Sequence, residues 1–381
     1  MQVLVAGAGY AGLGVIKSLE AKLPRDIDIT LVDQNEFHLI QHELHRLIRY
    51  PELMDDITIP LDEVVDRTEI IQGTIESISP DDASLTLTSG RILEPTILVI
   101  SLGAVTADWG IPGVKSNTVS MKTVEDALHV HERLADADTR IVVAGAGLSG
   151  VQVAGEIAEF QAANGTGPRV TVLEQADRVT PTFPRNFSEQ VADALTEIGV
   201  VVRNGTEIIR VNDDGVLCAD NRTIPAEEVI WTAGITAPAA FNGPRYEVRS
   251  DLRLTKRTFA LGDAAIVTDN RGTVVPAAAQ TAIRQAPIVA TNIARLIEAD
   301  RSETSYVFEP RLERYTHTSP GWVVSIGDKA VAMVGDSVVD GAAAKVLKFS
   351  INTGYLGSIG AIDRSVQSVT DKLGWPRTTD C

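Results

Sequence analysis

The sequence predicts an α/β protein made of two Rossmann-like dinucleotide-binding domains, the second inserted in the first, and a small C-terminal α+β cap. Three observations predict this architecture. A strand, a glycine-rich turn, a helix and a second strand ending in an acid occur near the N-terminus, and the same pattern returns in the middle of the chain. The C-terminal part is rich in strands instead. The length of 381 residues leaves room for two or three domains at roughly 100–200 residues each.

The first pattern starts with an apolar strand at residues 3–6 and continues with a helix whose apolar residues recur at helical spacing. A Gly-x-Gly-x-x-Gly turn joins them, and the next strand, residues 27–32, leads into an aspartate. Glycines let the backbone approach a pyrophosphate, the helix N-terminus offers it free N–H groups, and the acid accepts from a ribose hydroxyl. We therefore predict a nucleotide site at Gly7, Gly9, Gly12 and Asp33.

The second pattern has the same order, with a strand at residues 141–144, a helix to about residue 160 and a strand at residues 170–173. Its predicted site consists of Gly145, Gly147, Gly150 and Glu174. A carboxylate at this place accepts from a free ribose 2′-hydroxyl and repels a 2′-phosphate, so we expect NADH to be preferred to NADPH. The neighbouring Arg178 is a cation that would oppose this preference.

Short strands and one long helix account for most of the remaining chain. We expect them at residues 69–100, 229–231, 258–261, 277–296 (the helix), 322–324 and 330–334. Gly262 and Asp263 follow directly after one of these buried strands. Residues 342–351 carry two lysines beside bulky apolar groups. This segment either lies on a bilayer with its apolar face down or packs on the first domain with its lysines in water.

The charge balance, 34 basic against 51 acidic residues, gives a net charge of −17 and argues against a nucleic-acid partner. Repeated acidic pairs are typical of proteins from a high-salt interior, so we predict halophilic behaviour, with stability that rises as salt screens the repulsion. The alternative is an ordinary acidic cytosolic protein. The N-terminus has no export signal and no apolar run suits a spanning helix, which indicates a cytoplasmic protein. Only Cys218 and Cys381 occur, and Cys218 is expected to be a small buried apolar residue.

Several segments resemble the type II NADH dehydrogenases (NADH:quinone oxidoreductases), a family of two-dinucleotide-binding flavoprotein reductases in respiratory electron transfer. They are Asp-Gln-Asn-Glu-Phe-His-Leu at 33–39, Trp-Thr-Ala-Gly at 231–234, Ala-Leu-Gly-Asp at 260–263, and Ala-Gln-Thr-Ala-Ile-Arg-Gln at 279–285. The resemblance implies an FAD-binding domain at 1–111 and 236–305, an NADH-binding domain at 112–235, and a cap at 306–381. It also allows a homodimer and a peripheral membrane contact through the C-terminal region.

The resemblance implies roles for further residues. Gly103, Gly262, Asp263 and Ala279 join the FAD site, and Gly234 joins the NADH site. Gln280 and Gln285 are the candidates for catalytic positioning beside the flavin and the quinone entrance. FAD supplies the chemistry, so no nucleophile is expected, and NADH is the substrate.

Three of the six histidines lie close together at 38, 42 and 45. A metal site is conceivable there, but without a carboxylate pair or cysteine at ligand spacing we predict no metal ligands. The alternatives are polar residues near the flavin or a proton relay at a quinone site, because quinone reduction consumes protons.

The chain departs from the family after the second glycine turn, where Gln152 replaces a common glutamate and the later Glu156 is retained. The C-terminal tail is also shorter than the family's membrane-anchoring helices. Two alternatives to quinone reduction therefore stay open. One is a soluble NADH-dependent reductase of a ferredoxin-like or rubredoxin-like acceptor. The other is a flavoprotein that senses NADH or docks partners with little turnover, which the replacement at residue 152 favours.

Overall fold

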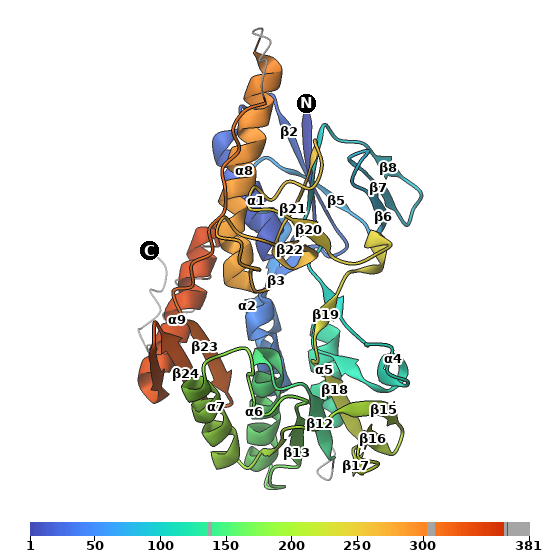
Figure 1. The fold of residues 1–381 in the computed structure, drawn as a ribbon, viewed down its shortest axis with the longest axis vertical. Coiled ribbons are helices and arrows are strands. Elements are labelled where there is room, and N and C mark those ends of the chain that lie inside the picture. The colour runs from blue at the N-terminus through green and yellow to red at the C-terminus, as the bar shows by residue number, and fades with distance from the viewer. Residues whose placement is uncertain (136–138, 303–308, 362–363, 365–381) are drawn as a thin grey trace, which may run out of the picture.

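The computed structural model describes residues 1–135, 139–302, 309–361 and 364. Figure 1 shows the first nucleotide-binding unit in the upper half, the second in the lower half, and the C-terminal strands and helix beside the second. The residue Cys381 lies outside the described part.

The first unit is built on a five-stranded parallel sheet. Its strands are, in spatial order, β21 (Thr258–Ala260), β9 (Ile97–Ile100), β1 (Gln2–Ala6), β2 (Asp28–Asp33) and β5 (Glu69–Gln72). All four residues of β9 are buried, as expected of a parallel strand that is covered on both faces. Helix α1 (Tyr10–Lys22) covers this sheet and packs along α8 (Ala279–Arg301).

The second unit repeats this plan. Its parallel sheet has the order β11 (Val119–Ser120), β18 (Glu228–Trp231), β12 (Ile141–Ala144), β13 (Val170–Leu173) and β14 (Val201–Arg203). Its helices are α5 (Val124–Arg133), α6 (Leu148–Ala163) and α7 (Arg185–Glu197). The antiparallel sheet β15 (Ile208–Asn212), β16 (Gly215–Cys218) and β17 (Thr223–Pro225) lies at its edge. Cys218 is buried there, as predicted.

Two chain crossovers join the units. They form the antiparallel pair β10 (Val105–Thr106) and β19 (Ile235–Thr236). The second unit is therefore inserted between two parts of the first, which confirms the predicted topology. The domain limits near residues 111 and 235 stay predictions.

The C-terminal part begins as an extended segment on the first unit, where the Tyr315 N–H donates to the carbonyl of Ser250. It continues as the antiparallel strands β23 (Trp322–Ile326), β24 (Lys329–Val334) and β25 (Ser337–Asp340), and ends with α9 (Gly341–Ser358). Ala344 of α9 is fully buried against β24. Expecting both lysines of this segment in water was wrong, because Lys348 is only 16% exposed and binds Glu43 and Ser325.

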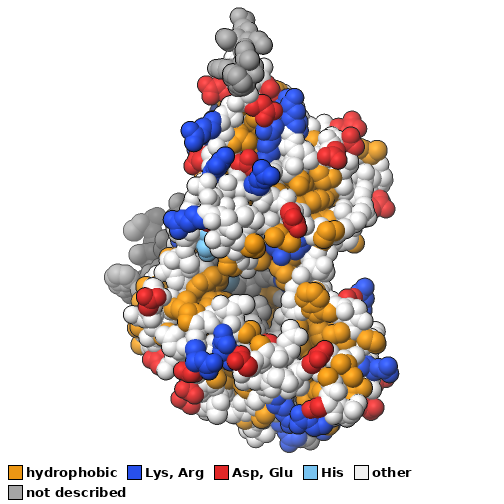
Figure 2. Space-filling view, in the orientation of Figure 1, with side chains coloured by type: hydrophobic (Ala, Val, Ile, Leu, Met, Phe, Trp, Pro, Cys, Tyr) orange, Lys and Arg blue, Asp and Glu red, His pale blue; other side chains and the backbone are white. Residues whose placement is uncertain are grey.

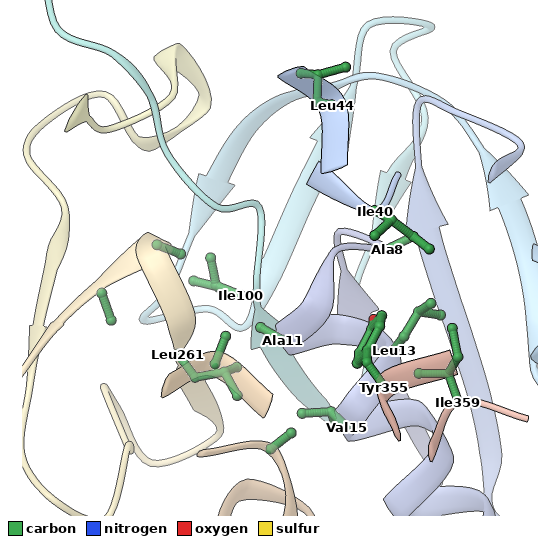
Figure 3. Close-up of a cluster of buried hydrophobic side chains, with 14 of the residues drawn as sticks. Ala8, Ala11, Leu13, Val15, Ile40, Leu44, Ile100, Leu261, Tyr355 and Ile359 are labelled. Atoms are coloured by element: carbon green, nitrogen blue, oxygen red, sulfur yellow. The ribbon is translucent and has the colours of Figure 1, made fainter. Parts of the chain in front are cut away.

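The predicted long helix is present but starts at Ala279, since Ala278 is extended, and it runs to Arg301. Figure 3 shows part of the core beneath the first glycine turn, where Tyr355 and Ile359 from the C-terminal part lie beside Leu13 of α1. The remaining short elements are β3 (Phe37–Leu39), β4 (Thr58–Pro60), β6 (Ile75–Ser79), β7 (Ser84–Leu87), β8 (Ile92–Leu93), β20 (Tyr246–Val248), β22 (Ala265–Val267), α2 (Met54–Ile57), α3 (Leu61–Val64), α4 (Val114–Asn117), and the 3₁₀ helices η1 (Gln41–Ile48), η2 (Pro51–Leu53), η3 (Ala239–Phe241) and η4 (Gly262–Ala264).

Candidate dinucleotide and electron-transfer site

The first glycine turn has the shape that a pyrophosphate requires. Gly7 has a φ of +103°, and a Cβ on Gly12 would lie 1.8 Å from the Gly7 carbonyl oxygen. A Cβ on Gly9, by contrast, would meet nothing within 4 Å, so this backbone faces open space. Gly9 is also the N-cap of α1, which has no side-chain cap and no acid in its first turn. Its free N–H groups and helix dipole suit an anion.

The second turn repeats this geometry. Gly145 has a φ of +96°, a Cβ on Gly150 would lie 2.0 Å from the Gly145 carbonyl oxygen, and a Cβ on Gly147 would meet open space. Helix α6 likewise starts without a side-chain cap. Both turns therefore fit a bound dinucleotide, and they do so independently of each other.

The two predicted acids fix these turns. Asp33 accepts from the Ala8 N–H at 2.6 Å, and Glu174 accepts from the Ala146 N–H at 2.8 Å. A carboxylate oxygen can accept a second hydrogen bond, so each acid retains capacity for a ribose hydroxyl. Arg178 is already engaged, because its Nη2 donates to the Pro181 carbonyl at 2.8 Å.

A hydroxyl side chain at the end of the neighbouring strand binds the backbone carbonyls of each turn. This contact was not predicted from the sequence. The Ser101 hydroxyl, directly after β9, lies 2.8 Å from the Ala6 carbonyl oxygen and 3.0 Å from that of Gly7. Thr232, directly after β18, makes the corresponding contacts in the second unit. The signal was available in the sequence, since a hydroxyl residue follows each of these buried strands and a glycine follows two residues later, at Gly103 and Gly234.

Gly103 and Gly234 both have positive φ but different surroundings. A Cβ on Gly103 would meet open space, as a backbone beside a ligand requires. Gly234 is covered by the Trp109 ring, whose Nε1–H donates to the Ala233 carbonyl. Trp109 is 66% exposed and has a φ of +53°, and the sequence analysis did not identify it.

The Gly262–Asp263 turn is part of η4 and packs against the N-terminal half of α8. Burial raises the pKa of Asp263, and Lys122 and Arg245, two cations that the sequence analysis missed, oppose this rise. Arg245 also donates through Nε to the Asp263 carbonyl at 2.6 Å. The two cations offset only part of the effect of burial, so the pKa of this carboxyl stays raised.

The two glutamines on α8 differ in their surroundings. Gln285 is buried and its Oε1 accepts from the Gly262 N–H at 2.8 Å, so it holds this turn in place. Gln280, next to Ala279 in the first turn of α8, has a buried amide nitrogen with no hydrogen-bond partner in the described structure. An orphaned buried donor indicates a ligand acceptor at this position. The catalytic roles of both residues stay predictions.

The histidines do not converge on one point. The His38 Nδ1 lies 2.8 Å from the Ala8 carbonyl and its Nε2 lies 2.8 Å from the Tyr355 hydroxyl, while His42 pairs with Tyr10. Burial lowers the pKa of His38 to about 4. Within the described residues no cluster of three His, Cys, Asp or Glu side chains could hold a metal ion. The tyrosines that support this region were not identified from the sequence, because Tyr355 comes from a distant helix.

Figure 2 shows a hollow between the upper and lower halves of the molecule, which hold the first and the second glycine-turn unit (Figure 1). A family model described as pyridine nucleotide-disulphide oxidoreductase matches residues 1–286. The chain belongs to this family. Two glycine turns with their acids are what its nucleotide chemistry requires.

Relatives and solved structures agree with this assignment. The chain is 27% identical to a type II NADH:quinone oxidoreductase of Staphylococcus aureus, over 95% of this chain and 96% of that protein. Its fold matches NDH2 of Plasmodium falciparum, solved in complex with NADH, with a TM-score of 0.81 at 14% identity, covering 98% of this chain and 99% of that chain. It also matches the sulfide:quinone oxidoreductase of Aquifex aeolicus, with a TM-score of 0.77 at 20% identity, covering 100% and 98%.

The sequence holds two cysteines, and Cys218 is buried in the edge sheet of the second unit, where burial raises the pKa of its thiol. A thiol with a raised pKa is a poor nucleophile. Over the described ranges, none of the helices is long and apolar enough to cross a membrane.

Proposed function

We propose that this chain oxidises NADH, passes its two electrons through FAD held at the first glycine turn, and reduces a quinone. The observation that carries the proposal is the pair of complete turns in one chain without a cysteine pair between them. Similarity to type II NADH:quinone oxidoreductases over nearly the whole chain supports quinone as the acceptor.

FAD, when bound, supplies the capacity to take a hydride from NADH and to release the electrons to an acceptor. The protein's own residues bind and orient. The first turn, with Asp33 and Asp263, holds the FAD, and the second turn, with Glu174, holds the NADH. Small side chains at the start of α8, residues 277–279, leave room for a flat quinone ring. The free Gln280 amide would donate to a quinone carbonyl as negative charge develops on it.

The test is stopped-flow spectroscopy of the FAD-loaded protein, which separates reduction by NADH from reoxidation by a water-soluble quinone analogue. Gln280→Leu should slow reoxidation by roughly 10²–10³-fold if its contact forms in the transition state, and leave reduction nearly unchanged. Gln190→Leu, on the exposed face of α7, is the matched control. Unchanged reoxidation in Gln280→Leu would contradict the proposed quinone site. Fast reoxidation by a ferredoxin-like carrier alone would favour the alternative acceptor.

We also propose that the protein binds its quinone at the cytoplasmic surface of a membrane, which it contacts through exposed apolar side chains of α9 and of the adjoining strands. Val346 and Ile351 are 65% and 49% exposed, and Val334 and Val339 add apolar surface on the adjoining strands. Such a face suits the interfacial region of a bilayer. Flotation with lipid vesicles should recover the wild type and much less of Val346→Asp, with equal FAD content. Equal recovery of the two would contradict this contact.

A further inference from the structure

A buried polar cluster lies where the three parts of the molecule meet. It consists of Glu43 and His45 on η1, Gln152 on α6, Ser325 on β23 and Lys348 on α9, which we call the junction cluster. Glu43 and His45 are 3% and 5% exposed, and the Lys348 side chain is 16% exposed. Charged groups buried to this degree cost free energy unless they are paired.

The hydrogen bonds of the junction cluster converge on the Ser325 hydroxyl. Lys348 donates to it at 2.7 Å and Gln152 donates at 3.2 Å, so both lone pairs of the oxygen are used. The hydroxyl proton is then directed to the His45 Nε2, 2.9 Å away. His45 must accept at this nitrogen and is therefore neutral, which agrees with a pKa that burial and Lys348 hold well below its ordinary value.

The counter-charge of Lys348 comes from an unexpected position. Its ammonium lies 3.3 Å from a carboxylate oxygen of Glu43. Residue 152, where the resembled family has a glutamate, is neutral here, yet its amide touches the same Ser325 oxygen as Lys348 does. A carboxylate at residue 152 would face Lys348 from the other side. The chain thus keeps one carboxylate beside this lysine but carries it on η1.

The junction cluster reaches both glycine turns. Gln152 lies two residues after Gly150, near the start of α6. On the other side, the His42 Nε2 lies 3.9 Å from Glu43, and its Nδ1 lies 2.6 Å from the hydroxyl of Tyr10, which directly follows Gly9. Polar groups therefore lie between the two places where the dinucleotides are expected, joined by hydrogen bonds except at the 3.9 Å contact between His42 and Glu43.

Resting on the proposed function, we propose that Glu43 is a positioning residue that replaces the missing carboxylate of residue 152, and that the junction cluster passes on the proton taken up in quinone reduction. That reaction converts NADH, a quinone and one proton to NAD⁺ and a quinol. Solvent supplies the proton. Glu43 keeps Lys348 charged and directed at Ser325, and Ser325 in turn orients His45.

Other charged groups surround the junction cluster and set its titration. Arg46 pairs with Glu43 at 3.0 Å, and Arg49 bridges Glu156 of α6 and Asp328 beyond β23. Burial would raise the pKa of Glu43, but Lys348 with His42, His45 and Arg46 holds it well below its usual range. Burial raises the pKa of Glu156 to about 7 against the opposing effect of Arg49. The His131 ring bonds the Ile48 carbonyl from α5.

The experiment moves the carboxylate from residue 43 to residue 152, on the other side of Lys348. Glu43→Gln should slow flavin reoxidation by a quinone analogue by roughly 10²-fold and shift its pH profile. The double variant Glu43→Gln with Gln152→Glu should recover most of the rate and the wild-type profile. Glu52→Gln, an exposed carboxylate near η1, is the matched control. An ion pair that only stabilises the fold would alter thermal midpoints but not the pH profile of correctly folded protein.

A second measurement covers the case in which Glu43→Gln does not fold. Removing both charges, as in Glu43→Gln with Lys348→Met, leaves neither member of the Lys348–Glu43 pair as an unpaired ion. Arg46 loses its contact with Glu43 in this variant, but its side chain is 25% exposed and can reach water. Thermal midpoints of this variant and of Lys348→Met then report the pairing independently of activity. The double variant Glu43→Gln with Lys348→Met should be more stable than Lys348→Met alone, and its flavin reoxidation should lack the wild-type pH profile. A wild-type profile in either Glu43 variant, or no recovery in the charge-swapped double variant, would overturn the inference. Failure of the wild type itself to reduce quinone would instead contradict the proposed function.

Discussion

The two glycine turns, residues 7–12 and 145–150, have the same backbone geometry, but different parts of the molecule pack over them. In each, the first glycine has a positive φ, the third packs against the carbonyl of the first, and a hydroxyl from the neighbouring strand clamps the turn. The first turn lies beneath parts from outside its own βαβ unit, namely α8 and Tyr355 of α9. Helix α6 behind the second turn also packs on outside parts, namely β23 and η1. The second turn itself is more open, because Ser149 is exposed where the corresponding Ala11 is buried, and an exposed indole, Trp109, lies over its neighbouring strand end.

This difference separates a resident cofactor from an exchanging one. Pyrophosphate binding depends on residues within one βαβ unit, since it needs only the glycines, the helix N-terminus and one acid. How long the ligand stays depends on the tertiary cover. A turn enclosed by two distant helices suits FAD that remains bound, and a more open turn suits NADH that must leave after each cycle.

The largest expected effects come from adding one methyl group to each turn. Gly12→Ala places a carbon 1.8 Å from a carbonyl oxygen and should abolish FAD binding, whereas Gly150→Ala, at 2.0 Å, should leave the protein yellow but unable to be reduced by NADH at a normal rate. FAD per chain and the rate of flavin reduction measure the two effects. Gly354→Ala, whose Cβ meets nothing within 4 Å, is the control. A Gly12→Ala protein with full FAD content would end the assignment of the first turn.

Substitutions of the two acids, Asp33 and Glu174, should affect different cofactors. Glu174→Ala removes a charged acceptor for the ribose 2′-hydroxyl, so the ratio of kcat/KM for NADH to that for NADPH should fall by roughly 10- to 100-fold. Asp33→Ala should lower FAD content and leave the ratio unchanged. An unchanged ratio in Glu174→Ala would mean that Arg178 or another residue selects the nicotinamide cofactor.

The smallest effects concern stability, and they have opposite signs in the two units. The folded-state pKa of His38 is lowered from 6.5 to about 4, so its contribution is present above pH 6.5 and is lost as pH falls through about 4. The pKa of Glu156 is raised from 4.5 to about 7, so its contribution is present below pH 4.5 and is lost as pH rises through about 7. Each amounts to roughly 3 kcal/mol of unfolding free energy.

Chemical denaturation across this pH range checks both signs. Relative to the wild type, His38→Gln should gain stability as the solution becomes acidic, and Glu156→Gln should gain stability as it becomes neutral to alkaline. The exposed Glu52→Gln should follow the wild type at every pH. If the free energy of unfolding varied with pH in the same way for the wild type and both variants, neither group would be buried as described.

Local sequence determined the two Rossmann units. Apolar runs such as residues 97–100 predict buried parallel strands, and the glycine spacing predicts turns whose geometry depends on atoms within one βαβ unit. The predicted insertion of the second unit is confirmed by the ribbon of β10 and β19. These features were predictable because hydrophobic periodicity and the conformational freedom of glycine act over short distances in the chain.

Only the tertiary structure decided what surrounds those turns. One of the two alternatives for residues 342–351 placed their lysines in water, yet the fold places Lys348 against Glu43, 305 positions earlier in the chain. Tyr355 meets His38, and Trp109 meets Ala233, in the same way. No local pattern encodes such pairs. They form because burial removes water from these polar groups, and each must then find a partner among whatever side chains the packed elements bring to it.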